Sequence, residues 1–274
     1  MWHTYSCVSV MMTQNVIYMW EVLEMYVEHR DFEKPSDESI KLWRYMDFTK
    51  FVYLLHRKAL FFSRADRLDD PFEGSYSRTN VRLRPLVYEK IPQKQLAIAS
   101  NFYREMRRYV VINSWHMNEH ESDAMWKLYL KTDKGIAIQS TFSKLTESFK
   151  NYKDPVYIGI MKYIDYETDW LPEGNLFFPF LHKRKSFSHE NEIRAIVSRV
   201  PSKKDEKGGL ETDLSQEAFQ DGLDVMVELD ILVERVVTHP AAPTWFVDLV
   251  KSVTNKYGLG KPVDVSKLSE RPVY

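Results

Sequence analysis

The fold is decided by residues 42–63, which read LWRYMDFTKFVYLLHRKALFFS. The first five of them, at 42–46, are mainly apolar and aromatic and predict a short strand. Asp47 can then cap a helix, because its carboxylate accepts hydrogen bonds from the free N–H groups of the first turn. The helix is indicated by apolar residues on one stripe, namely Phe48, Phe51, Val52 and Leu55. Residues 60–63 predict a second strand, so this segment indicates a mixed α/β domain.

The alternation of strands and helices continues along the chain. Further strands are predicted at 109–115, 135–140, 156–164, 190–200, 223–231, 233–238 and 263–265. Further helices are predicted at 94–108, 123–131, 176–183 and 246–257. The polar stretch 201–221 predicts a surface excursion. We therefore expect residues 41–274 to form a single mixed α/β (α+β) domain with a mixed, partly antiparallel sheet flanked by helices.

Residues 1–40 are expected to form an N-terminal helical extension and a linker. An amphipathic helix is indicated by apolar residues at helical spacing, namely Val16, Trp20, Leu23 and Val27. Pro35 stands in a polar stretch that follows and predicts the linker. The apolar run from Cys7 to Tyr26 falls short of the ~20 apolar residues that cross a bilayer, because it is interrupted by Thr13, Gln14, Asn15, Glu21 and Glu24. We expect no membrane partner.

Composition limits the classes of function. The 274 residues include 38 Lys and Arg and 39 Asp and Glu, which gives a net charge of −1. This near-neutral charge argues against purely electrostatic binding to nucleic acid or to an anionic membrane. The single cysteine, Cys7, excludes an internal disulfide and is typical of a reducing, cytoplasmic compartment. Neither glycine-rich phosphate loop nor a Gly-x-Ser-x-Gly motif is present, which argues against P-loop, dinucleotide-fold and serine-hydrolase enzymes.

The sharpest candidate site is the stretch KRKSFSHENEIR at 183–194. If its last residues form a strand, Glu190, Glu192 and Arg194 project to one face. Two neighbouring carboxylates beside cations can hold unequal pKa values, and the ionised one can bind a ribose hydroxyl and stabilise an oxocarbenium-like charge. The alternative is a solvated strand face on which Glu192 and Arg194 neutralise each other.

Arg44 is the second candidate, since it stands between Trp43 and Tyr45. A guanidinium between two rings can hold a phosphate or carboxylate bidentately while a base stacks alongside. The alternative is an ion pair between Arg44 and an acidic loop residue such as Asp70 or Glu73.

Two groups of residues could bind a metal ion. Asp69, Asp70 and Glu73 can bind a hard divalent cation, but their spacing matches no calcium loop and a hydrogen-bonded turn is the alternative. His116 and His120 lack the His-Glu-x-x-His order of a zinc helix, so we interpret them as a surface pair. We expect no metal cofactor.

Five segments in this order resemble a bacterial family described as domain of unknown function 2971. They are WRY at 43–45, FFS at 61–63 with DDPFE at 69–73, MW at 125–126 with Tyr129 and GIAI at 135–138, the stretch 183–194, and 236–240 with SKL at 266–268. Two departures are Asp69, where the family favours Asn, and Phe187, where it favours Trp. The resemblance implies a bacterial protein, encoded among accessory genes near phage-defence or abortive-infection functions.

The order of elements is also similar to ADP-ribosyltransferases. That similarity implies that Arg44 contacts the phosphate or ribose of NAD, that Glu192 is the catalytic carboxylate, and that Glu190 assists on the target side. Ser114 and Ser140 are the two candidates for the Ser/Thr motif of such enzymes. The further residues expected to bind NAD are Tyr45, Ser63, Trp126 and Arg194, although the pattern of Met125, Trp126 and Tyr129 is more typical of core residues.

The leading hypothesis is therefore an NAD-consuming, ADP-ribosyl-transfer-like effector in phage defence or stress, with a nucleotide-like small molecule as its partner. One alternative is a non-enzymatic module that binds a ligand or a protein. Another is a metal-dependent nuclease that uses Asp69, Asp70, Glu73 and Glu190. The sequence leaves the protein or nucleic-acid target and the oligomeric state open.

Overall fold

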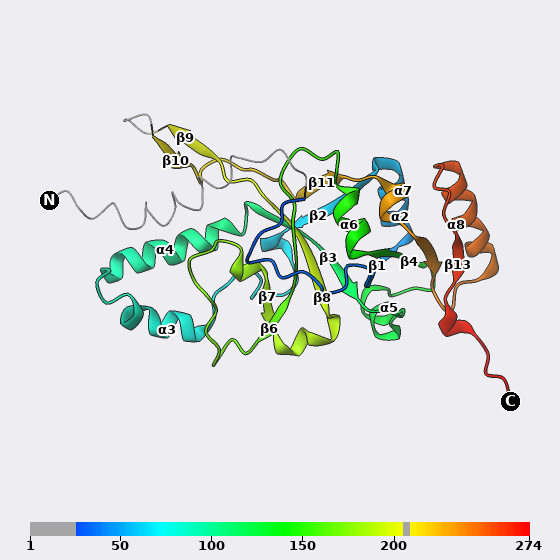
Figure 1. Ribbon diagram of the computed structural model, residues 1–274, viewed down its shortest axis with the longest axis horizontal. Helices are drawn as coiled ribbons and strands as arrows, with labels where there is room; N and C mark the ends of the chain where they lie inside the picture. The colour runs from blue at the N-terminus through cyan, green and yellow to red at the C-terminus, as the bar shows by residue number, and fades with distance from the viewer. Residues whose placement is uncertain (1–25, 205–208) are drawn as a thin grey trace.

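The computed structural model describes residues 26–204 and 209–274, and a nine-stranded sheet runs through its centre (Figure 1). The predicted N-terminal amphipathic helix lies outside the described residues, apart from Val27. The strands of the sheet are β1 (Lys41–Asp47), β2 (Ala59–Arg64), β3 (Val110–Met117), β4 (Gly135–Thr141), β5 (Tyr157–Ile160), β8 (Glu192–Ser198), β11 (Gly222–Met226), β12 (Arg235–Thr238) and β13 (Val263–Val265).

The sheet is antiparallel except for the pair β12–β13. Its strand order is β11-β2-β3-β1-β4-β12-β13, and β8 joins β3 to β5. One edge of β3 pairs with β8 from Val110 to His116, while the other edge is shared by β2 and β1. This sharing brings β1 and β8 to opposite edges of the same strand.

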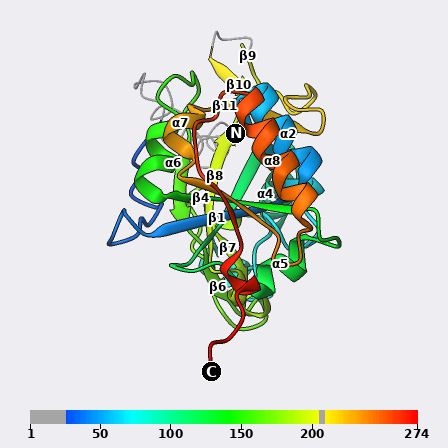
Figure 2. The same ribbon diagram turned by 90° about the vertical axis from the view of Figure 1, so that its right-hand side faces the viewer.

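Helices surround the sheet, which confirms the predicted α+β class. They are α2 (Phe48–Arg57), α3 (Arg78–Val87), α4 (Gln93–Met106), α5 (Asp123–Tyr129), α6 (Phe142–Ser148), α7 (Leu229–Leu232) and α8 (Thr244–Lys256). Figure 2 shows α2 and α8 side by side, and α6 beside α7. Two small sheets complete the fold: β9 (Ser202–Lys204) with β10 (Leu210–Thr212), and β6 (Lys162–Ile164) with β7 (His182–Arg184).

The segment that opens the domain folds as predicted. Asp47 caps α2 by accepting a hydrogen bond from the Lys50 N–H at 2.8 Å. Phe51 and Leu55 of α2 are buried against the sheet in the main core, beside Phe62 of β2. Local capping and the apolar stripe therefore suffice to place β1, α2 and β2 in order.

Two smaller clusters flank the main core. Phe32, from the segment expected to be a linker, packs with Tyr157 and Phe177. Trp126 packs with Tyr45 in the other cluster. The described part of residues 1–40 is thus packed against the domain at Phe32.

The structure corrects several predicted elements. The strand expected at 156–164 divides at Met161, where the chain leaves β8 and pairs with β7 instead. The helix expected at 176–183 is a 3₁₀ turn, Phe178–Phe180, followed by β7. Glu190 ends a second 3₁₀ turn, Lys185–Glu190, and so lies outside β8. Asn191 has a φ of 38°, and this left-handed residue turns the chain into the strand.

The segment expected to form strands at 223–231 and 233–238 holds β11, the short helix α7 and β12. Helices α3 and α6 were not predicted. In α3 the pattern is obscured by Pro85 and by three arginines, so little apolar periodicity remains. Among the described residues, no helix has the length and apolar character needed to cross a membrane.

Candidate functional site

Five charged side chains gather at the start of β8, and we call them the ion-pair cluster: Glu73, Lys183, Glu190, Glu192 and Arg194. They come from four parts of the fold. Glu73 lies in the loop after β2, and Lys183 lies in β7. Glu190 lies in the turn Lys185–Glu190, and Glu192 and Arg194 lie in β8. All five are buried. A buried charge is tolerated only when it is paired and hydrogen-bonded, and here each is paired.

Arg194 holds the middle of the cluster and is 1% exposed. Its Nη2 and Nη1 donate to the two oxygens of Glu73 at 2.6 and 2.7 Å. Its Nε donates to Glu192 Oε1 at 2.6 Å, and Nη1 also reaches the Phe180 carbonyl at 3.0 Å. All three guanidinium nitrogens are therefore engaged within the protein, which leaves Arg194 little capacity to bind NAD directly.

Lys183 joins the three carboxylates of the cluster. Its Nζ lies 2.5 Å from Glu190 Oε2, 3.2 Å from Glu192 Oε2 and 3.7 Å from Glu73 Oε1. It also lies 4.8 Å from the centre of the Phe187 ring. Burial acts to lower the pKa of Lys183, but Glu192, Glu190 and Glu73 together outweigh it and hold the pKa above its ordinary value. Lys183 is a fixed positive charge.

The two glutamates next to β8 have unequal pKa values. Burial acts to raise the pKa of Glu192, but Arg194 and Lys183 bring it down to about 2. Burial raises the pKa of Glu190, although Lys183 opposes the shift. Glu192 is therefore a permanent carboxylate, while Glu190 takes up a proton more readily.

Arg44 on β1 differs from the cations of the cluster. Its Nη1 donates to the Ser114 carbonyl of β3 at 2.5 Å, and among the described residues it has no ion pair. The two acids predicted as partners of Arg44 form ion pairs with other residues. Asp70 pairs with Arg184 at 2.8 Å, and Glu73 pairs with Arg194. The remaining N–H donors of Arg44 are thus available to an anion.

Electrostatic contact links Arg44 to the cluster. Burial lowers the pKa of Arg44 to about 10, and the nearby Tyr129 and Glu192 oppose this shift. Ser114 lies between them, since it is opposite Arg194 in the β3–β8 register and its side chain helps to lower the pKa of Glu192. The structure therefore brings together Arg44, Ser114 and Glu192 from three strands.

Three other predicted residues, Tyr45, Ser63 and Trp126, have partners within the protein. Trp126 is 1% exposed, and its ring packs edge-on against Tyr45 at 4.9 Å. The Trp126 Nε1 donates to Glu121 at 3.0 Å, and Tyr45 Oη accepts from the Ser122 N–H at 2.8 Å. These polar groups are already satisfied by the protein. Ser63 lies on β2, paired with Gly222 and Ile112.

His116 is buried rather than on the surface, which corrects the interpretation of a surface pair. Its Nδ1 donates to the Glu190 carbonyl at 2.6 Å, so His116 helps to hold the turn that carries Glu190. Burial lowers the pKa of His116, and its Nε2 is enclosed without a hydrogen-bond partner. His120 is exposed. In the described ranges, no group of three or more His, Cys, Asp or Glu side chains is arranged to hold a metal ion.

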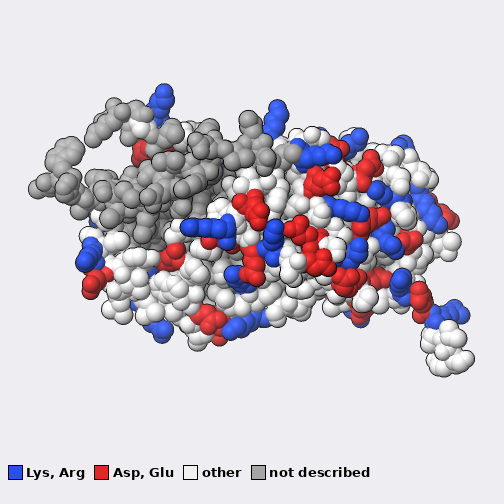
Figure 3. All heavy atoms as spheres, viewed as in Figure 1, with Lys and Arg blue, Asp and Glu red and all other residues white. Residues whose placement is uncertain are grey.

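Sequence reasoning missed the joint role of Glu73 and Lys183. Lys183 lies within the stretch 183–194, but Glu73 is predicted as a turn residue, a metal ligand or a partner of Arg44, and no local signal connects it to Arg194. On the face in Figure 3, positive and negative side chains are intermingled over the described part of the surface.

Comparison of the chain with models of protein families, with curated proteins and with solved structures found no match. The resemblance to the domain of unknown function 2971 family therefore stays a prediction.

Proposed function

We propose that this protein is an NAD-consuming, ADP-ribosyl-transfer-like enzyme of the bacterial cytoplasm that acts in phage defence or stress. The proposal is carried by one observation, the meeting of Arg44, Ser114 and Glu192 from β1, β3 and β8. A cation with spare donors next to a permanent carboxylate suits a substrate that has both a diphosphate and a ribose.

Each residue has a role that its environment supports. Arg44 binds the diphosphate, because its guanidinium has a single hydrogen bond within the protein. Glu192, ionised at all ordinary pH values, stabilises positive charge on the ribose. The C1′–N bond breaks with its electron pair passing to the pyridinium nitrogen, so that neutral nicotinamide leaves. Glu190, whose pKa is raised, accepts the proton of the hydroxyl or water that attacks C1′.

A second candidate is a non-enzymatic binding module, and it is favoured by the complete pairing of Glu192. Both carboxylate oxygens of Glu192 are engaged, by Arg194 at 2.6 Å and by Lys183 at 3.2 Å. In this case the ion-pair cluster is structural, and Arg44 alone recognises an anionic ligand.

The decisive experiment incubates the purified protein with NAD and measures released nicotinamide by chromatography. The enzyme proposal expects release by the natural chain and loss of release in Glu190→Gln and in Glu192→Gln, with circular dichroism confirming that both remain folded. Glu147→Gln, at an exposed position on α6, is the matched control. No release by the natural chain, even with nucleic-acid and protein targets added, contradicts the enzyme proposal. NAD binding that needs Arg44 but survives Glu192→Gln without any turnover supports the binding module instead.

A further inference from the structure

Positive charge is concentrated in the arm formed by α3, α4 and their connection, residues 78–108. The arm contains eight Lys and Arg against two Glu, a surplus of six, whereas the chain as a whole has a net charge of −1. The cations are Arg78, Arg82, Arg84, Lys90, Lys94, Arg104, Arg107 and Arg108. Figure 1 shows the arm at the end of the molecule opposite to α8. The near-zero total charge thus hides a strongly cationic region.

Several of these cations are free to meet a partner. Arg78, Arg84 and Arg108 form ion pairs with Glu167, Glu173 and Glu105. Four other cations are exposed and have no ion pair within the described chain: Arg82, Lys90, Lys94 and Arg104. An acidic partner gains attraction from these side chains without breaking an existing pair.

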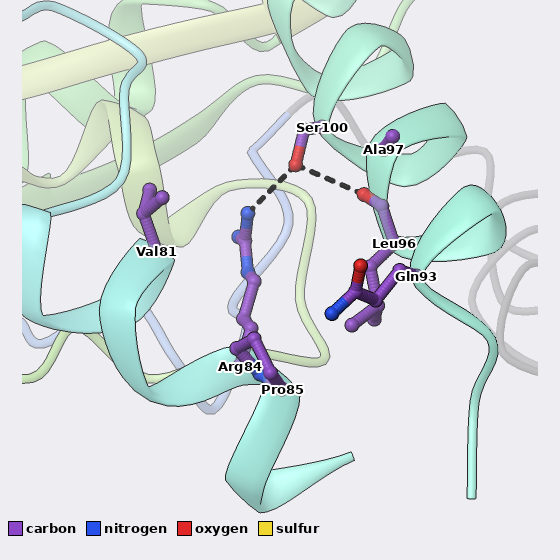
Figure 4. A pocket seen from close by; sticks show the side chains of 7 residues that line it. All are labelled: Val81, Arg84, Pro85, Gln93, Leu96, Ala97 and Ser100. Atoms are coloured by element: carbon purple, nitrogen blue, oxygen red, sulfur yellow. Dashed lines mark hydrogen bonds between the residues drawn. The ribbon is translucent and has the colours of Figure 1, made fainter. Parts of the chain in front are cut away.

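The arm also presents apolar side chains to solvent. Val81, Leu86, Val87 and Ile98 are 60%, 73%, 55% and 56% exposed. Between the two helices lies a hollow with a volume of about 190 Å³, and Pro85, Leu96 and Ala97 are among its lining residues (Figure 4). At about 30 Å³ for each water, it holds roughly six waters that an inserted side chain can displace.

One polar group in the hollow is incompletely satisfied. Figure 4 shows the Arg84 side chain extending between the helices toward Ser100, to which its Nη1 donates at 3.1 Å. Its Nε donates to Glu173 at 2.8 Å, but its Nη2 is enclosed and has no hydrogen-bond partner. Arg84 is only 7% exposed, and its guanidinium also lies 4.5 Å from the centre of the Tyr76 ring, so it is a fixed positive charge beside the hollow.

We propose that the α3–α4 arm is a docking surface for an acidic peptide segment of another protein, anchored by an aliphatic side chain in the hollow. The acidic residues pair with the exposed cations, and the anchor fills the hollow. The hollow of about 190 Å³ accommodates a single inserted side chain, which favours a peptide over a bilayer surface. A nucleic acid is disfavoured, because no aromatic side chain of the arm is among the exposed ones on which bases stack.

The test uses a fluorescein-labelled synthetic peptide of about 15 residues that is rich in Glu and Asp and has two leucines at positions i and i+4. Binding is followed by fluorescence anisotropy at low salt. We expect saturable binding that weakens as salt is added. Replacing the leucines by serine, or the acids by glutamine, weakens binding about tenfold. Vesicles of phosphatidylserine and a single-stranded DNA oligonucleotide serve as competing probes.

Variants of the protein locate the binding. The double substitution Arg82→Glu with Lys94→Glu weakens peptide binding at least about tenfold, and Ala97→Trp, which fills the hollow, does the same. Lys150→Glu, at an exposed position on the body, leaves binding within about twofold. Circular dichroism confirms that every variant is folded. Absence of peptide binding, equal loss in Lys150→Glu, indifference to the leucines, or tighter binding to vesicles or DNA overturns the proposal. These results do not depend on NAD cleavage.

Discussion

Glu73 and Arg194 form a two-point contact across 121 residues of chain, with Nη2 to Oε1 at 2.6 Å and Nη1 to Oε2 at 2.7 Å. Glu73 is 3% exposed and Arg194 is 1% exposed, so water does not share the contact. The pair fastens the loop after β2 to the start of β8. Because Arg194 also holds Glu192, the loop and the candidate carboxylate share one guanidinium.

Replacing Glu73 by glutamine is expected to destabilise the protein by about 3 kcal/mol, since it leaves a buried guanidinium with one carboxylate fewer. Arg194 keeps its hydrogen bond to Glu192, so the expected loss of unfolding free energy is at the low end of the range for a broken buried ion pair. Urea unfolding measures the change, and Glu147→Gln at an exposed position is the control. A cost below about 1 kcal/mol would mean that the pair adds little to folding.

Acid is expected to weaken the fold through Glu192. Its pKa is about 2 in the folded protein and 4.5 ordinarily, so its contribution is complete above about pH 4.5 and is lost as the pH falls toward 2. A shift of this size corresponds to about 3 kcal/mol. Urea unfolding at several pH values between 6 and 2 should therefore show a smaller acid-induced loss of stability in Glu192→Gln than in the natural chain. Equal losses in the two proteins would contradict this prediction.

The residue after Glu73 is expected to be intolerant of a side chain. Gly74 has a φ of 70°, and a Cβ there would lie 2.4 Å from Phe180 Cε1 and 2.9 Å from Arg107 Cγ. Gly258 has a similar φ of 74°, but a Cβ there would meet nothing within 4 Å. Gly258→Ala should cost only the backbone strain of roughly 1–2 kcal/mol. Gly74→Ala should cost about 1–3 kcal/mol more, because packed side chains must shift.

Thermal or urea unfolding of both glycine variants measures that difference directly, because the backbone contribution is shared. Equal costs would show that Phe180 moves aside freely.

Arg44→Lys is expected to lower nicotinamide release by about 10- to 100-fold while leaving the fold intact. A lysine keeps the charge, but it loses the planar fork that holds a phosphate at two points. The single bond of Arg44 to the Ser114 carbonyl makes a large loss of stability unexpected. Initial rates of release at NAD concentrations well below KM measure the effect, with Arg235→Lys on β12 as the matched control. Unchanged rates in Arg44→Lys would remove Arg44 from the site.

The sequence predicted those parts of the fold that depend on local signals. The cap at Asp47 and the apolar stripe of α2 involve residues a few positions apart, so β1, α2 and β2 were predictable. The turn that removes Glu190 from β8 depends on the backbone angle of one residue, Asn191, which no periodicity reports. The partner of Arg194 depends on which loop packs over β8, and that is a tertiary property.

The candidate site was predictable to the same limited extent. Arg44, Glu190 and Glu192 were identified from charge beside aromatic or acidic neighbours. Arg44 and Glu192 lie near each other because β1 and β8 both pair with β3. Strand propensities alone do not determine this pairing.

The contact between Glu73 and Arg194 also sets a time order during synthesis. A ribosome that adds about 5–20 residues each second needs on the order of 6–24 seconds to make the 121 residues between them. Throughout that interval the Glu73 loop has been made while its arginine has not. The segment that forms β1, α2 and β2 is therefore made long before β8, and the Glu73–Arg194 contact can form only after β8 leaves the exit tunnel.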